Sequence, residues 1–284
     1  MKKALMICIL LLSMLAISVF AGTAEAIVNG TLDGNNHPYV CLVVFDVETN
    51  GVAEPAWRTT GILLSPTVVL TPGHGTDGAA SARVWLDFGP IASVDDDPPG
   101  EYPYGGDTSY EGTPYTMPGF GYSLTNPGLP GWITCDVGVV VLDEAVPAAV
   151  VGVYGKLPDV GEANDLNVMD YVDLVGYGVQ YQVTPRNNGG PYYAWAGIRA
   201  RYFVQAQLIS KKFAISDSFL MTSANKAKGK GGTAFGDSGG PLLKAGTDTV
   251  LALTSFGADV NCASPGYYYR VDQTDVLNFI NVYL

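Results

Sequence analysis

The sequence predicts an all-β protein. Glycine and proline are abundant, with 35 and 18 residues in a chain of 284, and these residues separate short strands in β proteins. Most apolar segments are short runs rich in valine, isoleucine and leucine with turn residues at their ends, which is typical of buried strands. Strongly periodic helical patterns are scarce before the C-terminus.

Several segments carry the strand signal. The apolar, β-branched run 37–45 indicates a buried strand. The run 61–71 indicates two short strands broken at Ser65-Pro66, and the loop after it holds His74 at a strand end. Further strands are predicted at 133–142, 171–177, 202–209 and 249–255.

The other two predicted elements are a connection and a helix. Residues 145–156 are expected to cross between two halves of the chain. Residues 272–284 have apolar residues at helical spacing and predict a terminal amphipathic helix. Its apolar face would contain Val276, Leu277, Ile280, Tyr283 and Leu284.

Residues 1–26 have the features of a secretory signal. Two N-terminal lysines precede an apolar run, 4–22, and Ala24-Glu25-Ala26 supplies the small residues that signal peptidase requires. Cleavage there predicts a mature chain that begins at Ile27. A cut after Ala21 also fits the pattern, and the length of the run allows an uncleaved anchor. We expect a secreted protein, extracellular or periplasmic.

Charge and cysteine content narrow the possible partners. The net charge of −12 argues against binding to nucleic acid and to anionic membrane surfaces. The mature chain keeps Cys41, Cys135 and Cys262, an odd number, so at most one intrachain disulfide can form and its pair stays open. Their spacing matches no zinc site, and no metal ligand set is predicted.

The stretch 89–131 is irregular and rich in carboxylates. We interpret it as a solvated insertion. Structural Ca²⁺ is the alternative, although the spacing of the acidic residues matches no EF-hand. No other cofactor is expected.

The strongest chemical motif is Gly236-Asp237-Ser238-Gly239-Gly240-Pro241. Its glycines leave the Ser238 hydroxyl unshielded, and the N–H groups of Gly236 and Ser238 can stabilise an oxyanion. Gly-x-Ser-x-Gly also occurs in α/β-hydrolases, where the histidine follows the serine. Here both histidines, His37 and His74, precede Ser238, which is the chymotrypsin-like order. An α/β esterase also fails because alternating helices are lacking.

Four ordered blocks resemble the trypsin/chymotrypsin-like serine endopeptidase family over nearly the whole mature chain. They are the start Ile27-Val28-Asn29-Gly30, the histidine block 70–74, the aspartate block 135–142 and the serine block 236–241. The resemblance implies two packed six-stranded antiparallel β-barrels of chymotrypsin-like type with a C-terminal α-helix. The implied domains are a first barrel at 27–150, with His74 and Asp136, and a second at 151–284, with Ser238.

The resemblance also implies the roles of individual residues. His74 would be the general base, Ser238 the nucleophile and Asp136 the group that holds the imidazole in its working tautomer. Ser255 resembles the serine that supports this aspartate. The competing interpretations are a surface histidine for His74 and a turn residue for Asp136. His37 is given no catalytic role.

Asp237 resembles the aspartate that pairs with a freed N-terminal amine in the family. Loss of one partner from such a buried pair typically costs about 3–5 kcal/mol, so the pairing can act as a switch. Ala26, and not Lys or Arg, precedes Ile27. The hypothesis is that signal cleavage itself frees the active N-terminus, without a separate zymogen.

The chain also departs from the family pattern. Gly75 stands where a cysteine commonly follows the histidine, and Ala234 replaces the usual partner of Cys262. Phe256 replaces a tryptophan on one wall of the pocket. A largely absent disulfide framework suggests a divergent member, such as a bacterial one.

The family's spacing places Gly232 at the base of the specificity pocket, with Thr233 beside it and Gly257 and Gly266 on the walls. No carboxylate stands there to pair with Arg or Lys, so we expect an uncharged pocket for apolar or aromatic side chains. Lysines close by in sequence instead allow a preference for acidic substrates, although a solvated loop is the favoured interpretation: Lys226, Lys228 and Lys230.

Together these features predict a secreted serine endopeptidase that acts as a monomer on protein or peptide substrates. It would need neither nucleic acid nor a membrane after signal cleavage. The alternative is a catalytically inactive, protease-like binding module. Such proteins usually lack a triad residue or the oxyanion glycine, and here all are present.

Overall fold

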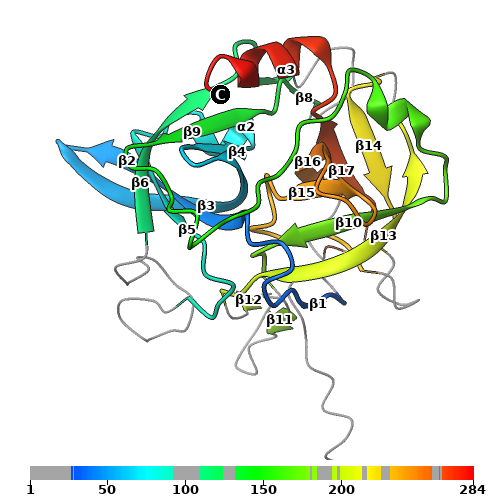
Figure 1. Ribbon diagram of the computed structural model, residues 1–284, viewed down its shortest axis with the longest axis horizontal. Helices are drawn as coiled ribbons and strands as arrows, with labels where there is room; N and C mark the ends of the chain where they lie inside the picture. Colours follow the sequence, from blue (N-terminus) through cyan, green and yellow to red (C-terminus); the bar gives the residue numbers. More distant parts are fainter. Residues whose placement is uncertain are drawn as a thin grey trace, which may run out of the picture.

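Two closed, six-stranded antiparallel barrels lie side by side and form the body of the molecule (Figure 1). The predicted all-β, two-barrel architecture is therefore confirmed. The computed structural model describes residues 27, 29–91, 109–123, 132–179, 181–183, 194–196, 199–212, 216–224, 231–257, 262 and 264–284. The predicted signal, residues 1–26, lies outside this part of the chain and stays a prediction.

The first barrel contains four predicted strands and two that were not predicted. In order around the barrel they are β2 (Val40–Thr49), β3 (Val52–Ser65), β4 (Val68–Thr71), β9 (Gly138–Leu142), β6 (Ser109–Thr116) and β5 (Ser81–Trp85). Residues 40–45 are fully buried, because their branched and aromatic side chains suit a packed barrel. The expected break at Ser65-Pro66 separates β3 from β4. Charged residues, glycine and proline within β5 and β6 concealed these two strands in the sequence.

The second barrel follows the crossover. Its strands, in order, are β13 (Tyr202–Ser210), β10 (Tyr171–Gly176), β15 (Pro241–Lys244), β16 (Val250–Gly257), β17 (Gly266–Arg270) and β14 (Phe219–Thr222), and β14 closes onto β13. The strands predicted at 171–177, 202–209 and 249–255 are confirmed. Strand β1 (Thr31–Leu32) also pairs with β13, so a segment from the start of the predicted first domain adds to the second barrel.

Three short elements lie outside the barrels. Strands β7 (Gly121–Ser123) and β8 (Trp132–Thr134) form one hairpin, and β11 (Tyr181–Val183) and β12 (Ala194–Ala196) form another. The 3₁₀ helix η1 (Glu162–Asp165) lies between the barrels in sequence. The hairpin of β11 and β12 extends below the second barrel in the view of Figure 1.

The predicted C-terminal helix is α3 (Thr274–Asn281), drawn in red in Figure 1. Its buried residues Val276, Leu277 and Ile280 join a core cluster that contains residues of both barrels. Tyr283 contacts Tyr115 of β6, with ring centroids 4.9 Å apart. The expectation that Leu284 belongs to the buried face is wrong, because the helix ends at Asn281 and Leu284 is exposed. In the described part of the chain, no helix has the length and apolar character to cross a membrane.

A buried arginine ties the N-terminal segment to both barrels. The guanidinium of Arg201 donates to Asp33 Oδ2 at 2.9 Å and to the Val40 carbonyl at 2.8 Å, and its side chain is fully buried. His37 adds a 2.6 Å contact from Nδ1 to Asp33 Oδ1. Burial alone would raise the pKa of Asp33, but the hydrogen bonds from His37 and the charge of Arg201 lower it below its usual value. The N-terminal segment is thus anchored by a charged network.

Cys41, Cys135 and Cys262 all have reduced thiol side chains. Cys41 and Cys262 are buried, and burial raises the pKa of Cys41 to about 12. A buried thiol of this kind is chemically inert. The question of which pair forms a disulfide is therefore answered: the structure contains no disulfide among these residues.

Candidate active site

His74 lies on a single helical turn, α2 (Gly73–Thr76), at the end of β4. The turn is pressed closely against the aspartate segment: a Cβ atom added to Gly73 would lie 2.9 Å from the Val137 nitrogen and 3.0 Å from the Cys135 carbonyl oxygen. Only glycine allows this approach. The imidazole stays 22% exposed, so it borders solvent at the junction of the barrels.

Asp136 lies two residues before β9 and is fully buried. Its carboxylate lies 3.0 Å from His74 Nδ1 through each oxygen and accepts the backbone N–H of His74 at 2.8 Å. The hydroxyl of Ser255, on β16 of the second barrel, donates to Asp136 Oδ2 at 2.5 Å. The partners that a buried carboxylate requires are therefore present, and the predicted trio of His74, Asp136 and Ser255 is brought together.

Ser238 lies on the loop that leads into β15, and this loop packs against the first barrel. A Cβ atom added to Gly239, whose φ is +78°, would lie 2.2 Å from Pro72 Cδ. Thr60 of β3 donates its N–H to the Ser238 carbonyl at 2.8 Å and its hydroxyl to the Gly236 carbonyl at 2.9 Å. These contacts place Ser238 beside the histidine turn, because Pro72 is two residues before His74.

Two features of this loop bear on catalysis. Among the described residues, the N–H groups of Gly236 and Ser238 have no acceptor, as an oxyanion site requires. In the same part of the chain, no hydrogen bond joins the His74 imidazole to the Ser238 hydroxyl. Catalytic hydrogen bonds are often long without substrate and tighten in the complex.

The carboxylate of Asp237 is fully buried beneath the loop. It accepts the N–H of Gly178 at 2.7 Å and that of Ala234 at 2.8 Å. Burial raises the pKa of Asp237 to about 7, although these N–H groups and the charge of Arg58 act in the opposite direction. Ile27 is buried in the core of the second barrel, with its nitrogen in the peptide bond to Ala26. Its pairing with Asp237 needs a free amine and stays a prediction.

A pocket of about 200 Å³ opens beside Ser238. Four residues of the predicted site line it: Ser255, Thr233, Gly257 and Gly266. Cys262 and Phe256 also line it, and Phe256 stacks on Tyr267 with ring centroids 4.6 Å apart. Gly232 is not among the lining residues, because it packs against Ala224, whose Cβ would lie 2.3 Å from an added Cβ. Lys226, Lys228 and Lys230 fall outside the described residues.

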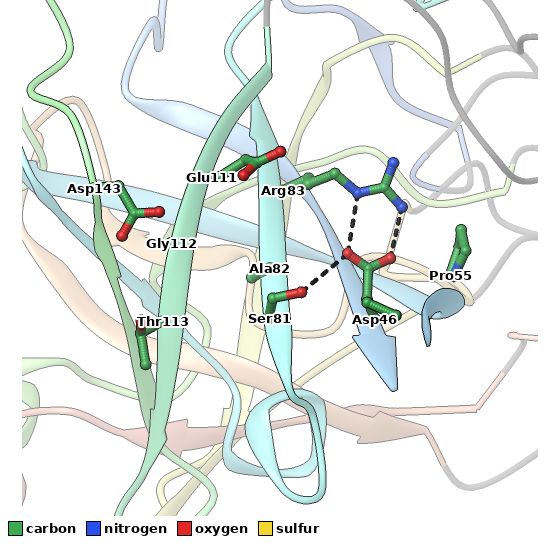
Figure 2. A pocket seen from close by; sticks show the side chains of 10 residues that line it. Asp46, Pro55, Ser81, Ala82, Arg83, Glu111, Gly112, Thr113 and Asp143 are labelled. Carbon is green, nitrogen blue, oxygen red and sulfur yellow. Dashed lines mark hydrogen bonds and ion pairs between the residues drawn. The ribbon is translucent and has the colours of Figure 1, made fainter. Parts of the chain in front are cut away.

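A larger cavity of about 490 Å³ lies between strands of the first barrel, away from this site (Figure 2). Arg83 donates to Asp46 at 2.6 and 3.1 Å, and Ser81 donates to the same carboxylate at 3.3 Å. Glu111 and Asp143 complete its polar lining. No histidine lines this cavity, so it lacks the base that would activate Ser81.

The interpretation of residues 89–131 as a solvated insertion, with structural Ca²⁺ as the alternative, stays a prediction. Most of the carboxylate-rich stretch, 92–108 and 124–131, lies outside the described residues. Within the described part, no three His, Cys, Asp or Glu side chains are grouped so that they could hold a metal ion.

Two antiparallel barrels, with a buried Asp–His pair and a glycine-flanked serine at their junction, define the chymotrypsin-like class of proteins. The family model described as Trypsin matches residues 28–280, and the chain belongs to this family. The resemblance that the four sequence blocks indicated is confirmed. A comparison with curated protein sequences finds no match.

Solved structures share this fold at low identity. HL collagenase is 16% identical with a TM-score of 0.62, and the match covers 92% of this chain and 96% of that chain. Human heparin binding protein is 15% identical with a TM-score of 0.58, covering 89% and 94%. The scabies mite inactivated protease paralogue S-D1 is 15% identical with a TM-score of 0.62, covering 90% and 97%. Since one of these is named as inactivated, the fold does not decide activity.

Proposed function

We propose that the chain is a secreted serine endopeptidase that hydrolyses peptide bonds through His74, Asp136 and Ser238. The observation that carries the proposal is the buried carboxylate of Asp136, which contacts His74 Nδ1 at 3.0 Å and accepts from Ser255. The histidine turn and the serine loop are also neighbours, because a Cβ atom added to Gly239 would lie against Pro72, two residues before His74. The arrangement matches the division of roles in a Ser-His-Asp triad.

The chemistry follows from these positions. His74 Nε2 would take the proton of the Ser238 hydroxyl as the oxygen attacks the substrate carbonyl, and Asp136 would stabilise the resulting imidazolium through Nδ1–H. The N–H groups of Gly236 and Ser238 would receive the oxyanion. His74 would then protonate the leaving amine, and a water activated by the same imidazole would hydrolyse the acyl-enzyme.

Activation is proposed to depend on export alone. Cleavage after Ala26 would free the Ile27 amine, and its ammonium would pair with the buried Asp237 carboxylate. This pair would offset the burial that now raises the pKa of Asp237 to about 7. The residue directly before Ile27 is Ala26, not Lys or Arg, so an activating protease of trypsin-like specificity would have no cleavage site there.

The substrate pocket is proposed to accept uncharged side chains. Its described lining contains neither Lys or Arg nor Asp or Glu, and its volume of about 200 Å³ suits an apolar side chain. With peptide substrates that differ only before the cleaved bond, we expect kcat/KM for Phe, Tyr or Leu to exceed that for Arg or Glu at least about tenfold, because the charge would lose its solvation without a partner. Fastest cleavage after Glu would instead support a role for the lysines of residues 226–230.

The alternative proposal is an inactive, protease-like binding module. Its support is the lack of a His74–Ser238 hydrogen bond in the described part of the chain, together with the inactivated paralogue among proteins of this fold. Both proposals predict the same fold and stability. The two proposals differ in the expected reactivity of the Ser238 hydroxyl.

Intact mass of the secreted protein before and after reaction with a fluorophosphonate separates the two. We expect a species that begins at Ile27 and gains one adduct, since only an activated serine attacks the probe. Ser238→Ala should lose the adduct and lower kcat by roughly 10⁶-fold, as in other triad enzymes. Ser81→Ala, in the cavity of Figure 2, is the matched control and should keep it. An unlabelled protein beginning at Ile27 would support the binding module, and an unlabelled longer species would indicate a zymogen.

A further inference from the structure

Arg58, on strand β3 of the first barrel, lies over the oxyanion loop of the second. A Cβ atom added to Gly236 would lie 2.7 Å from Arg58 Nη1, 2.9 Å from Cζ and 3.0 Å from Nη2. The whole guanidinium therefore covers the open face of this glycine, whose φ is +93°. An added side chain would have to displace the guanidinium, and the positive φ itself favours glycine at this position.

The same guanidinium is fixed in place from the second barrel. Arg58 Nη1 donates to the Tyr177 carbonyl at 2.8 Å. Tyr177 donates its own N–H to the hydroxyl of Thr60 at 3.1 Å, and that hydroxyl donates to the Gly236 carbonyl. Arg58 and Thr60 are two residues apart on one strand, so their side chains point to the same face. Together they hold Tyr177 and Gly236 as one unit.

This unit reaches the buried carboxylate under the loop. Gly178, which follows Tyr177, donates its N–H to Asp237 Oδ1 at 2.7 Å, and Asp237 follows Gly236. Among the described residues, the charged or titratable side chains that act electrostatically on or with Asp237 are Arg58 of β3 and Tyr268 of β17. Only Arg58 of these two carries a positive charge.

We infer that Arg58 is a positioning residue for the oxyanion site: it holds Gly236 in the conformation that directs its N–H at the substrate oxygen, and it supplies a cation that offsets the charge of Asp237. The inference rests on the proposed function for its catalytic half. Its electrostatic half concerns folding and does not need activity. This role of Arg58 could not be predicted from the sequence, because Arg58 lies 178 positions before Gly236 and belongs to no recognised motif.

If Arg58 positions the oxyanion site, its removal should lower kcat by a factor that does not depend on the leaving group of the substrate. Arg58→Met should lower kcat about 10- to 100-fold for a peptide and equally for an ester with a small alcohol leaving group. Removal of one oxyanion donor lowers kcat about 10²–10³-fold, and here the donor is displaced but still present. KM should change little. Arg58→Lys should recover part of kcat. A loss confined to the peptide substrate would overturn the inference, because Arg58 would then bind the residues after the cleaved bond.

The electrostatic half is read from stability against pH. While the Ile27 nitrogen is in its peptide bond, burial raises the pKa of folded Asp237 to about 7. Its contribution to stability is then complete below the ordinary pKa of an aspartate and is lost as the pH rises through 7. The comparison therefore uses a protein that keeps residues before Ile27. Without Arg58 the folded pKa rises further. The loss of Tm between pH 5 and pH 8.5 should therefore be larger in Arg58→Met than in the parent, and the difference should vanish in the Asp237→Asn background.

Arg83→Met is the matched control, since its partner Asp46 lies in the first barrel away from the loop. Arg83→Met should lower Tm at every pH without changing the fall in Tm between pH 5 and pH 8.5. An Arg58→Met protein with the parent's pH dependence would overturn the inference. If the parent protein fails to react with a fluorophosphonate, the proposed function fails, but the stability comparison still decides the role of Arg58.

Discussion

Replacement of Asp136 by Asn is expected to lower kcat/KM for a peptide substrate roughly 10⁴-fold, with the fold retained. The carboxylate accepts from His74 Nδ1, from the His74 backbone and from Ser255. An amide has one acceptor oxygen and a donor NH₂, so it cannot satisfy all three donors. The NH₂ would face Nδ1 and make it the acceptor. The proton would then sit on Nε2, where it blocks removal of the Ser238 proton.

The measurement is kcat/KM across pH for the variant and its parent, with Tm recorded beside it. Asp46→Asn is the matched control, because Asp46 is also a nearly buried carboxylate in the first barrel but pairs with Arg83. It should lower Tm and leave kcat within about twofold of the parent. An Asp136→Asn protein that keeps a tenth or more of the parent activity would contradict the assignment of the triad.

Replacement of Arg201 by Met is expected to be the most destabilising of the substitutions considered. Arg201 and Asp33 have fully buried side chains, and removal of Arg201 takes the guanidinium away from a buried carboxylate that keeps only its hydrogen bonds from His37. Such a change costs about 3–5 kcal/mol of the free energy of unfolding. For a domain of 150–250 residues this corresponds to a fall in Tm of about 6–20 °C.

The pair is tested by thermal unfolding of Arg201→Met, Asp33→Asn and the double variant. Since each single change leaves an unpaired group, the double variant should be more stable than the sum of the two losses predicts. Arg83→Met, which breaks a pair whose arginine is 22% exposed, should cost less than Arg201→Met, whose pair is fully buried. Strict additivity in the double variant, or a Tm for Arg201→Met within about 2 °C of the parent, would show that the ion pair does not carry the stability assigned to it.

Much of the candidate site could be predicted because its chemistry restricts the choice of residues. A glycine-flanked serine, a histidine at a strand end and an aspartate opening a buried strand are each unusual combinations, and their order in the chain excludes the elbow enzymes. Buried strands could also be predicted where β-branched and other apolar residues follow one another without interruption, as in residues 40–45. The fold class and the candidate triad residues could therefore be predicted from residue chemistry and local sequence pattern.

The unpredicted features depend on contacts between distant residues. Arg201 and Asp33 are 168 positions apart, and nothing in either local sequence marks a buried ion pair. Strands β5 and β17 were not predicted, because Arg83 in β5 and three consecutive tyrosines in β17 interrupt the usual alternation of apolar and polar residues. The place of Gly232 at the pocket base, assigned by spacing, stays a prediction; in the structure Gly232 packs closely on Ala224.

The two ends of the chain are exchanged between the barrels. Thr31 of β1 pairs with Phe203 in the second barrel, and Tyr283, after the C-terminal helix, contacts Tyr115 of β6 in the first. Neither half of the sequence contains a complete barrel with its cover, so the halves should not fold as independent units during synthesis. Contacts of such long sequence separation slow folding, because the loops must close before the contacts form. Assembly of the cleft is thus delayed until the last residues are available, and a chain still being made would carry no formed catalytic centre.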